Sequence, residues 1–336
     1  MIHVDDILHV TDMPGAQQLL LSTLTAKYGA PTVQTGDAGI YIGLEYAFNR
    51  AERSVRITME KQVNKILNQF DIVKGSRTPA GVNFLVIDPD SPRVSPTEFS
   101  SRVMSLYYLV SRVRPDLLFC VSFMATRITE CTESDAKKVL RIFQYLFATR
   151  DRGIVLKPTG YRLVFAIDAS YNILPGARSQ SGLHVTLCDI LPSSYDLDTS
   201  LQTSEYGPMI FRCIKQKLVA TSSFEAELNA VHEFRDLVIM LRLMMSEFGF
   251  NQDQPSVILQ DNGATLLTLR RGGRVFHGRS QAIDMRYFKQ HEYQIDGIVV
   301  FGRSASDDIS ADPLTKPMVS TKDQGKLARI CNDGGD

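Results

Sequence analysis

The sequence begins with two adjacent aspartates that could bind a divalent cation. Asp5 and Asp6 stand inside the otherwise apolar run MIHVDDIL. Hard cations such as Mg²⁺ prefer carboxylate oxygens, so paired carboxylates are suited to holding a cation beside a phosphate group. The run itself is expected to fold as a hairpin with the acidic pair at its turn. Two carboxylates alone do not complete such a site, so the other acids of the chain become important.

Four more acids lie at the ends of elements expected in the second half of the chain. Strand ends and helix starts converge on one edge of a layered α/β fold, so these carboxylates are expected to meet there. They could hold two divalent cations about 3.5–4 Å apart and clamp a phosphate for in-line attack by water, with Mg²⁺, or Mn²⁺ in its place, as the expected ion. Taken singly, each acid also fits a turn or a helix cap, but the ordered set favours a metal site. The four acids are Asp168 at the end of LVFAID, Glu227 in the first turn of a long helix, Asp261 at the end of VILQD, and Asp312 in a last short helix.

The first half of the chain is expected to hold a mixed strand-and-helix segment, a linker and a helical block. Residues 73–96 contain four prolines and two glycines, which is typical of a linker. Ser95 and Glu98 form a capping-box signature with proline at the first helical position, and Thr132 with Asp135 can cap a later helix. The expected helices are PGAQQLLLSTLTAKYG, EKQVNKILNQF, FSSRVMSLYYLVSRV, DLLFCVSFMATRI and AKKVLRIFQYLFATR, and the expected strands are GIYIGLEYAF and SVRITM.

From residue 153 the pattern changes to strands first and then to alternating helix and strand. This order predicts an α/β (mixed α+β) fold with helices packed on a mixed sheet. Ser222 and Glu225 mark the start of a long helix, and Gly249 marks its end. The expected strands are GIVL, YRLVFAID, GLHVTLC, MIFRCIKQKLVATSS, SVILQD and GIVVFGR, and the expected helices after the long one are GATLLTLRR, AIDMRYFKQHEYQ and ISADPLTK.

Composition and motifs argue against several other classes of protein. The chain has 336 residues, 44% of them hydrophobic and 22% charged, which indicates a soluble globular protein of two or three domains. No run approaches the ~18 apolar residues of a membrane helix, and no basic region precedes the first apolar run as in a signal peptide. We therefore expect an intracellular protein of the cytoplasm or nucleus, not a secreted one. The five cysteines form no Cys-x-x-Cys pair, and the sequence contains neither Gly-x-Ser-x-Gly nor the Gly-Lys-Ser/Thr of a P-loop.

The distribution of charge leaves nucleic-acid binding open. The net charge is zero, so overall charge does not argue for a nucleic-acid partner. Residues 101–160 hold ten Lys or Arg against five Asp or Glu, and residues 270–289 hold six basic residues against Asp284 alone. Local basic faces of this kind can follow a phosphate backbone. A solvated helix face is the alternative interpretation, and charge alone favours it.

Eight sequence blocks, in order, resemble a known family. HVDDILHV is similar to a Tyr-Val-Asp-Asp polymerase motif, and YIGLEY followed by ITMEKQVNKILNQFDI resembles the segment between a polymerase palm and thumb. EFSSRVMSLYYLVSRVRPDLLFCVSFMATRI and AKKVLRIFQYLFATRDRGIVL resemble the helical block of the same family. TSSFEAELNAV, QDNGATL, VFHGRSQAIDMRY and ADPLTKP resemble its RNase H blocks. From residue 1 to about residue 319, the chain resembles the C-terminal part of the Pol polyprotein of copia-type LTR retrotransposons.

The resemblance implies an RNase H-like domain with a mixed five-stranded sheet and an Asp-Glu-Asp-Asp site. Residue by residue, the four acids of that site match Asp168, Glu227, Asp261 and Asp312. The implied substrate is the RNA strand of an RNA–DNA hybrid, and the implied cofactor is Mg²⁺. Discrimination of RNA from DNA requires contact with 2′-hydroxyl groups. The residues expected to contact the nucleic-acid backbone are Lys215, Lys217, Arg279 and Arg286.

The resemblance also divides the chain into parts. Residues 1–72 match the end of a reverse transcriptase palm and the start of its thumb, and residues 73–157 match a linker with a helical thumb or connection. Residues 158–319 match the RNase H-like domain, and residues 320–336 are expected to be a tail. The expected partners are an RNA–DNA hybrid and the remainder of a Pol polyprotein, with no membrane.

The sequence departs from the family pattern in ways that shape the expected activity. It has no Trp, residues 189–208 look like an insertion, and Pro313 directly follows Asp312. His3 replaces the usual Tyr, and the acid that such polymerases supply from upstream is expected to be absent, so Asp5 and Asp6 are interpreted as a polymerase remnant. The main hypothesis is therefore an RNase H fragment without polymerase activity. The alternatives are a catalytically inactive nucleic-acid-binding remnant, and a polymerase that needs its missing part in trans.

Overall fold

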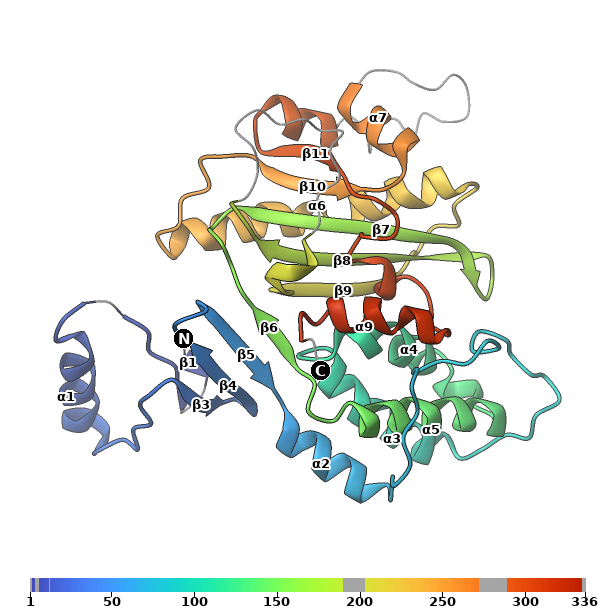
Figure 1. The fold of residues 1–336 in the computed structure, drawn as a ribbon, viewed down its shortest axis with the longest axis horizontal. Coiled ribbons are helices and arrows are strands. Elements are labelled where there is room, and N and C mark those ends of the chain that lie inside the picture. The colour runs from blue at the N-terminus through green and yellow to red at the C-terminus, as the bar shows by residue number, and fades with distance from the viewer. Residues whose placement is uncertain (1, 4–5, 12, 190–202, 272–288, 334–336) are drawn as a thin grey trace.

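The computed structural model describes residues 2–3, 6–11, 13–189, 203–271 and 289–333 (Figure 1). Its architecture is mixed α/β, as the element order predicts. A small N-terminal region, a block of helices and a five-stranded sheet with its own helices follow one another along the chain.

The N-terminal region is built on a four-stranded antiparallel sheet. Its strand order is β3-β4-β5-β6, and Ile57 of β5 pairs with Ile154 of β6, so the chain returns to this sheet after the helical block. Strands β1 and β2 pair antiparallel, with His3 opposite Asp6, so Asp6 lies in a strand and not at the expected turn, while Asp5 lies outside the described residues. The elements are β1 (Ile2–His3), β2 (Asp6–Ile7), α1 (Ala16–Tyr28), β3 (Ala38–Tyr41), β4 (Leu44–Asn49), β5 (Ser54–Thr58), α2 (Glu60–Gln69) and β6 (Ile154–Leu156).

The helical block begins at the capping signals read from the sequence. The Ser95 hydroxyl accepts a hydrogen bond from the Glu98 amide at 3.4 Å, which satisfies one of the free amides of the first turn. Thr132 and Asp135 form a complete capping box. Residues 73–95 contain no helix and no named strand. The helices are α3 (Pro96–Val110), α4 (Pro115–Ala125) and α5 (Glu133–Ala148).

A mixed five-stranded sheet forms the second half of the structure, with order β11-β10-β7-β8-β9. The first three strands of this sheet along the chain, β7, β8 and β9, form an antiparallel meander, and β10 pairs parallel with both β7 and β11. Such a mixed sheet was predicted. Residues 289–295 are helical, whereas the rest of the helix expected over AIDMRYFKQHEYQ lies outside the described residues. The elements are β7 (Leu163–Leu174), β8 (Arg178–Leu187), β9 (Ile210–Lys215), α6 (Ser223–Glu247), β10 (Ser256–Gln260), α7 (Gly263–Arg271), β11 (Val299–Arg303) and the 3₁₀ turn η3 (Asp312–Leu314).

The two faces of this sheet are covered differently. Because side chains alternate along a strand, Phe165 and Ile167 face one side, where they pack with Val231 and Phe234 of the long helix α6. Val164 and Ala166 belong to a separate apolar cluster together with Ile309 and Ala311, which precede η3. The segment that carries Asp312 therefore covers the face opposite α6.

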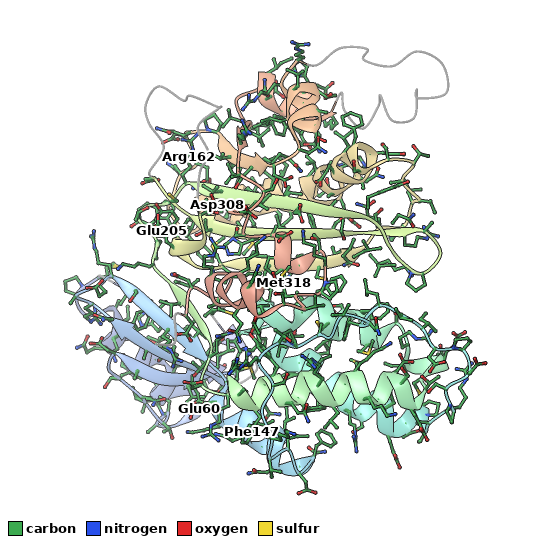
Figure 2. The ribbon with its side chains drawn as sticks, turned by 45° about the vertical axis from the view of Figure 1, so that its right-hand side comes forward. Glu60, Phe147, Arg162, Glu205, Asp308 and Met318 are labelled. Atoms are coloured by element: carbon green, nitrogen blue, oxygen red, sulfur yellow. The ribbon has the colours of Figure 1, made fainter. Side chains whose placement is uncertain are left out.

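The C-terminal residues join the sheet to the helical block. Figure 1 shows α9 (Gln324–Arg329), in red, between the five-stranded sheet and helices α3, α4 and α5. Met318, labelled in Figure 2, and Leu327 are buried in the same apolar cluster as the residues of α3, α4 and α5. The sequence indicated only a tail for residues 320–336, because six helical residues carry too little periodicity to reveal a buried face.

A fully buried ion pair stands at the start of α4. The Arg114 guanidinium donates to both carboxylate oxygens of Asp116, at 2.9 and 2.8 Å, and the Tyr145 hydroxyl donates to the same carboxylate at 3.1 Å. Burial alone would raise the pKa of Asp116, but Arg114 and these hydrogen bonds outweigh burial and lower it. Since Arg114 also donates to the Thr149 carbonyl at 3.0 Å, the network links α4 to the end of α5.

Asp116→Asn is expected to destabilise the protein by ~3–5 kcal/mol, because it leaves the buried Arg114 charge without its counter-ion. The measurement is the free energy of unfolding in urea. Lys137→Ala, on the exposed face of α5, is the control and should change stability by less than ~0.5 kcal/mol. Equal stability of the two variants would contradict the structural role of the ion pair.

Candidate metal centre

Three of the four predicted acids meet at one edge of the five-stranded sheet. Asp168, Glu227 and Asp261 each offer an oxygen, and these oxygens lie within 4.8 Å of one another. Asp168 and Glu227 are buried, and Asp261 is half-buried. Among the residues that the structure describes, this is the only group of three or more His, Cys, Asp or Glu side chains close enough to share a metal ion.

The sheet register places the two aspartates at the same level. Ala166 of β7 pairs with Leu259 of β10 in parallel, so Asp168 and Asp261 both follow two residues after a paired position. The sequence suggested that β7 ends at Asp168, but the strand continues to Leu174 because β8 still pairs with it there. Asp168 therefore lies where the parallel partner stops and the antiparallel partner continues. This discontinuity in pairing exposes one side of the strand to other elements.

Glu227 comes from the first turns of α6, and its helix begins at a local cap. The Ser222 hydroxyl accepts a hydrogen bond from the Glu225 amide at 3.2 Å, as the sequence predicted. The Glu225 carboxylate folds back onto Thr221, accepting from its amide and its hydroxyl at 2.7 Å. That contact occupies Glu225 and leaves Glu227 as the acid of this helix in the cluster.

Two polar side chains hold the carboxylates in place. The Thr315 hydroxyl lies 2.6 Å from Oδ2 of Asp168, and Nε2 of Gln260 donates to Oε2 of Glu227 at 3.2 Å. Sequence reasoning missed both residues. Their position next to predicted acids, in QD and in ADPLTK, is a signal that could have found them, because carboxylate ligands are commonly fixed by neighbouring hydrogen-bond donors.

The electrostatics of the cluster favour proton or cation binding. Burial, followed by repulsion from Asp261 and Asp312, raises the pKa of Asp168 to about 7, although the Thr315 hydrogen bond and Lys316 oppose this shift. Burial and the charges of Asp168 and Asp261 likewise raise the pKa of Glu227 well above its usual range. A divalent cation would relieve this repulsion, and an all-oxygen donor set suits Mg²⁺ or Mn²⁺. The residues present therefore fit a hard divalent ion.

Asp312, the fourth predicted acid, lies beside this group but is engaged by lysines. Its carboxylate is buried and forms an ion pair with Lys326 at 2.9 Å and another with Lys316. It is close enough to contribute to the raised pKa of Asp168. Asp312 as a metal ligand stays a prediction, and nothing in the sequence indicated its two lysine partners.

A glycine in β8 makes room for the segment that carries Asp312 and Thr315. Gly182 pairs directly with Asp168 across the β7–β8 ladder. A Cβ atom at this position would lie 2.6 Å from Cγ2 of Thr315 and 2.9 Å from the Ala311 carbonyl oxygen, both too close. The missing side chain thus allows η3 to pack against the sheet and Thr315 to reach Asp168.

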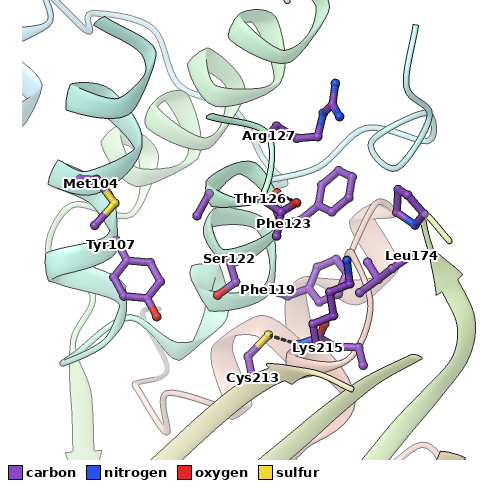
Figure 3. Close-up of a pocket in the computed structure, with 13 residues that line it drawn as sticks. Met104, Tyr107, Phe119, Ser122, Phe123, Thr126, Arg127, Leu174, Cys213 and Lys215 are labelled. Carbon is purple, nitrogen blue, oxygen red and sulfur yellow. Dashed lines mark hydrogen bonds between the residues drawn. The ribbon is translucent and has the colours of Figure 1, made fainter. Parts of the chain in front are cut away.

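The remaining predicted site residues do not join the cluster in the described part of the chain. Lys215 ends β9 and lines a cavity of about 390 Å³ between α3, α4 and the β7–β8 hairpin (Figure 3), and Lys217 is exposed just beyond it. Asp6 is exposed in β2. Asp5, Arg279 and Arg286 lie outside the described residues.

The chain is similar in sequence to Pol and Gag-Pol polyproteins of transposons. The chain is 26% identical, over 98% of its length, to "Retrovirus-related Pol polyprotein from transposon RE1" of Arabidopsis thaliana. It is 24% identical to "Retrovirus-related Pol polyprotein from transposon TNT 1-94" of Nicotiana tabacum over 96% of its length, and 24% identical to "Truncated transposon Ty1-A Gag-Pol polyprotein" of Saccharomyces cerevisiae over 94%. The chain spans 21%, 23% and 27% of these three proteins. No family model matches it.

These matches define first a class of protein: the chain is a relative of the Pol polyproteins of retrovirus-related transposons. More particularly, it is homologous to part of a copia-type Pol polyprotein, which confirms the resemblance seen in its sequence blocks.

Solved structures show weaker likeness. A foamy viral protease-reverse transcriptase in complex with an RNA/DNA hybrid matches 88% of this chain and 34% of its own, at 10% identity and a TM-score of 0.40. LC11-RNase H1 in complex with an RNA/DNA hybrid matches 46% of this chain and 94% of its own, at 11% identity and a TM-score of 0.31.

Within the described residues, no helix combines the length and apolar character that crossing a membrane requires.

Asp168→Asn is expected to stabilise the metal-free protein at pH 8 by ~1–4 kcal/mol. The pKa of Asp168 is higher in the folded protein, about 7, than its ordinary value of 3.8. The stability that its proton provides is therefore complete below pH 4 and is lost as the pH rises through 7. Urea unfolding in EDTA at pH 5, 6.5 and 8 should show a difference that grows with pH. Asp253→Asn, an exposed acid, is the control, and a constant difference at all three pH values would contradict the argument.

Gly182→Ala is expected to weaken Mn²⁺ binding and to cost ~1–3 kcal/mol of stability, because the added methyl group pushes Thr315 and η3 away from Asp168. Gly81→Ala is the matched control, since a Cβ there meets nothing within 4 Å. Mn²⁺ titration and urea unfolding of both variants measure the two effects. Unchanged Mn²⁺ affinity in the Gly182 variant would argue against a role for the close approach.

Proposed function

We propose that this chain hydrolyses the RNA strand of RNA–DNA hybrids with the help of divalent cations. The observation that carries this proposal is the cluster of Asp168, Glu227 and Asp261 oxygens within 4.8 Å, at the edge of a mixed sheet. Homology to transposon Pol polyproteins supports the same assignment. Because the chain spans about a fifth to a quarter of those relatives, the activity is proposed for this chain on its own site and not transferred from a whole protein.

In this proposal the residues of the chain divide the work by position. Asp168, Glu227 and Asp261 bind the cations, and Thr315 and Gln260 fix the orientation of the first two carboxylates. Divalent ions held by these residues would supply activation of a water molecule and stabilisation of the charge that develops on the phosphate. Burial of Asp168 and Glu227 keeps the carboxylates in a low-dielectric surrounding, in which their attraction for a cation is stronger than in water.

The nucleic-acid contacts and the domain division remain parts of the proposal. Lys215 and Lys217, with Arg279 and Arg286, are proposed to contact the backbone of the hybrid, and the RNase H-like domain is proposed to span residues 158–319. We propose no polymerase activity for these 336 residues by themselves. Asp6 is exposed and, within the described residues, belongs to no group of acids close enough to share an ion.

The proposal is tested with a fluorescently labelled RNA–DNA hybrid. The purified chain is expected to cut the RNA strand in Mg²⁺ or Mn²⁺, to stop in EDTA, and to leave a DNA duplex of the same sequence intact. Thr315→Val should slow cleavage by roughly 10–100-fold, the usual effect of losing a group that positions a metal ligand, and Asp168→Asn should slow it further. Asp253→Asn is the control and should cleave at the parent rate.

Two outcomes would overturn the proposal. Equal cleavage by the parent and by Asp168→Asn would mean that the activity comes from elsewhere. Salt-dependent binding of the hybrid without cleavage by the parent chain would favour the inactive, nucleic-acid-binding remnant. Primer extension by the parent chain alone would overturn the statement on polymerase activity.

A further inference from the structure

Two lysines from different segments hold the carboxylate of Asp312. Lys316 follows four residues after Asp312, and Lys326 comes from α9. The side chain of Asp312 is 4% exposed, so its charge is not screened by bulk water. Because Lys326 is tied to a helix that packs against the helical block, this contact also joins the metal centre to a second part of the structure.

Lys316 also interacts electrostatically with the other acids of the cluster. Burial of Lys316 would lower the pKa of its ammonium group, but Asp312, and then Asp168 and Asp261, outweigh burial and raise it. In the same way, Lys316 lowers the pKa of Asp168. The ammonium group therefore lies within the electrostatic field of the acids that would bind metal, and not only beside Asp312.

The charges of the acids and lysines limit how many divalent cations this cluster can hold. Four carboxylates of this cluster carry four negative charges when ionised. Two ammonium groups and one divalent cation balance them, whereas a second divalent cation would leave an excess of positive charge unless both ammonium groups moved away. An ammonium group is also a point charge with no preferred coordination geometry, which lets it substitute for a cation beside a carboxylate.

We propose that the ammonium groups of Lys316 and Lys326 occupy the second cation position of this centre. The first divalent ion binds at Asp168, Glu227 and Asp261, and a second binds only by displacing lysine from Asp312. Lys316 and Lys326 are positioning residues in this scheme, since they act through Asp312. The inference rests on the metal centre of the proposed function and adds an order to the binding of its ions.

The consequence is a large difference between the two binding steps. The first ion binds to three carboxylates that repel one another, so its binding reduces their electrostatic repulsion. The second ion must break an ion pair at 2.9 Å to Lys326 and a further one to Lys316 before it reaches Asp312. Breaking the pairs lowers the affinity for the second ion without changing the residues that coordinate the first.

The experiment counts bound Mn²⁺ by the electron paramagnetic resonance signal of the free ion. The parent chain is expected to bind one Mn²⁺ tightly and a second at least tenfold more weakly. In the double variant Lys316→Gln/Lys326→Gln, the second Mn²⁺ should bind at least tenfold more tightly than in the parent, with the first step nearly unchanged. Lys316→Arg/Lys326→Arg keeps both charges and should restore weak second binding.

Lys322→Gln is the matched control, because Lys322 is exposed in the 3₁₀ turn η4 (Thr321–Asp323) of the same C-terminal segment. Circular dichroism checks that each variant is folded. The single variant Lys316→Gln, at a side chain that is 49% exposed, provides the test if the double variant is unstable.

The outcomes separate this inference from the proposed function. Identical binding of two Mn²⁺ ions by the parent and by the glutamine variants would overturn the role of the lysines while leaving the metal centre intact. Loss of the second ion in the glutamine variants would overturn it as well. If neither the parent nor any variant binds a first Mn²⁺ ion, the metal centre itself is wrong, and the proposed function fails with it.

Discussion

The repulsion between buried carboxylates is the interaction on which this part of the molecule depends. Asp168 and Glu227 are both removed from water and lie within 4.8 Å of each other and of Asp261. Without a positive charge nearby, such a group must bind protons, and the raised pKa of Asp168 expresses this. A divalent cation would relieve this repulsion, and the three oxygens lie close enough together to share one.

The buried carboxylate of Asp116, in the helical block, is neutralised by side chains of the protein itself. Asp116 receives two hydrogen bonds from Arg114 and one from Tyr145, so its charge is fully compensated by the chain itself. That network stabilises the junction of α4 and α5. Asp312 stands between these two cases, since two lysines compensate a carboxylate that lies next to the uncompensated cluster. This difference is consistent with the proposed centre, in which an ion can bind directly at Asp168, Glu227 and Asp261 but must displace lysine to reach Asp312.

The C-terminal segment connects the two halves of the molecule through this centre. Thr315 contacts Asp168, Lys326 of α9 contacts Asp312, and Leu327 is buried with the helical block. The absence of a side chain at Gly182 permits this arrangement. The similarity to transposon Pol polyproteins covers 98% and 96% of the chain, and so extends over both halves. Any change that loosens α9 is thereby coupled to the surroundings of Asp312.

The sequence by itself determined the elements and the acids. The capping residues Ser95, Thr132 and Ser222 fix the starts of α3, α5 and α6, because a cap needs only residues three positions apart. The expected strands likewise placed Asp168 and Asp261 at one edge of the sheet, although β7 itself continues to Leu174.

Tertiary structure alone decided the rest. The pairing of Lys326 with Asp312, the space at Gly182 for Thr315, the return of β6 to the N-terminal sheet and the burial of α9 all join residues far apart in the chain. Such contacts leave no periodicity in the sequence, since what selects them is the shape and charge of a partner that folding brings near.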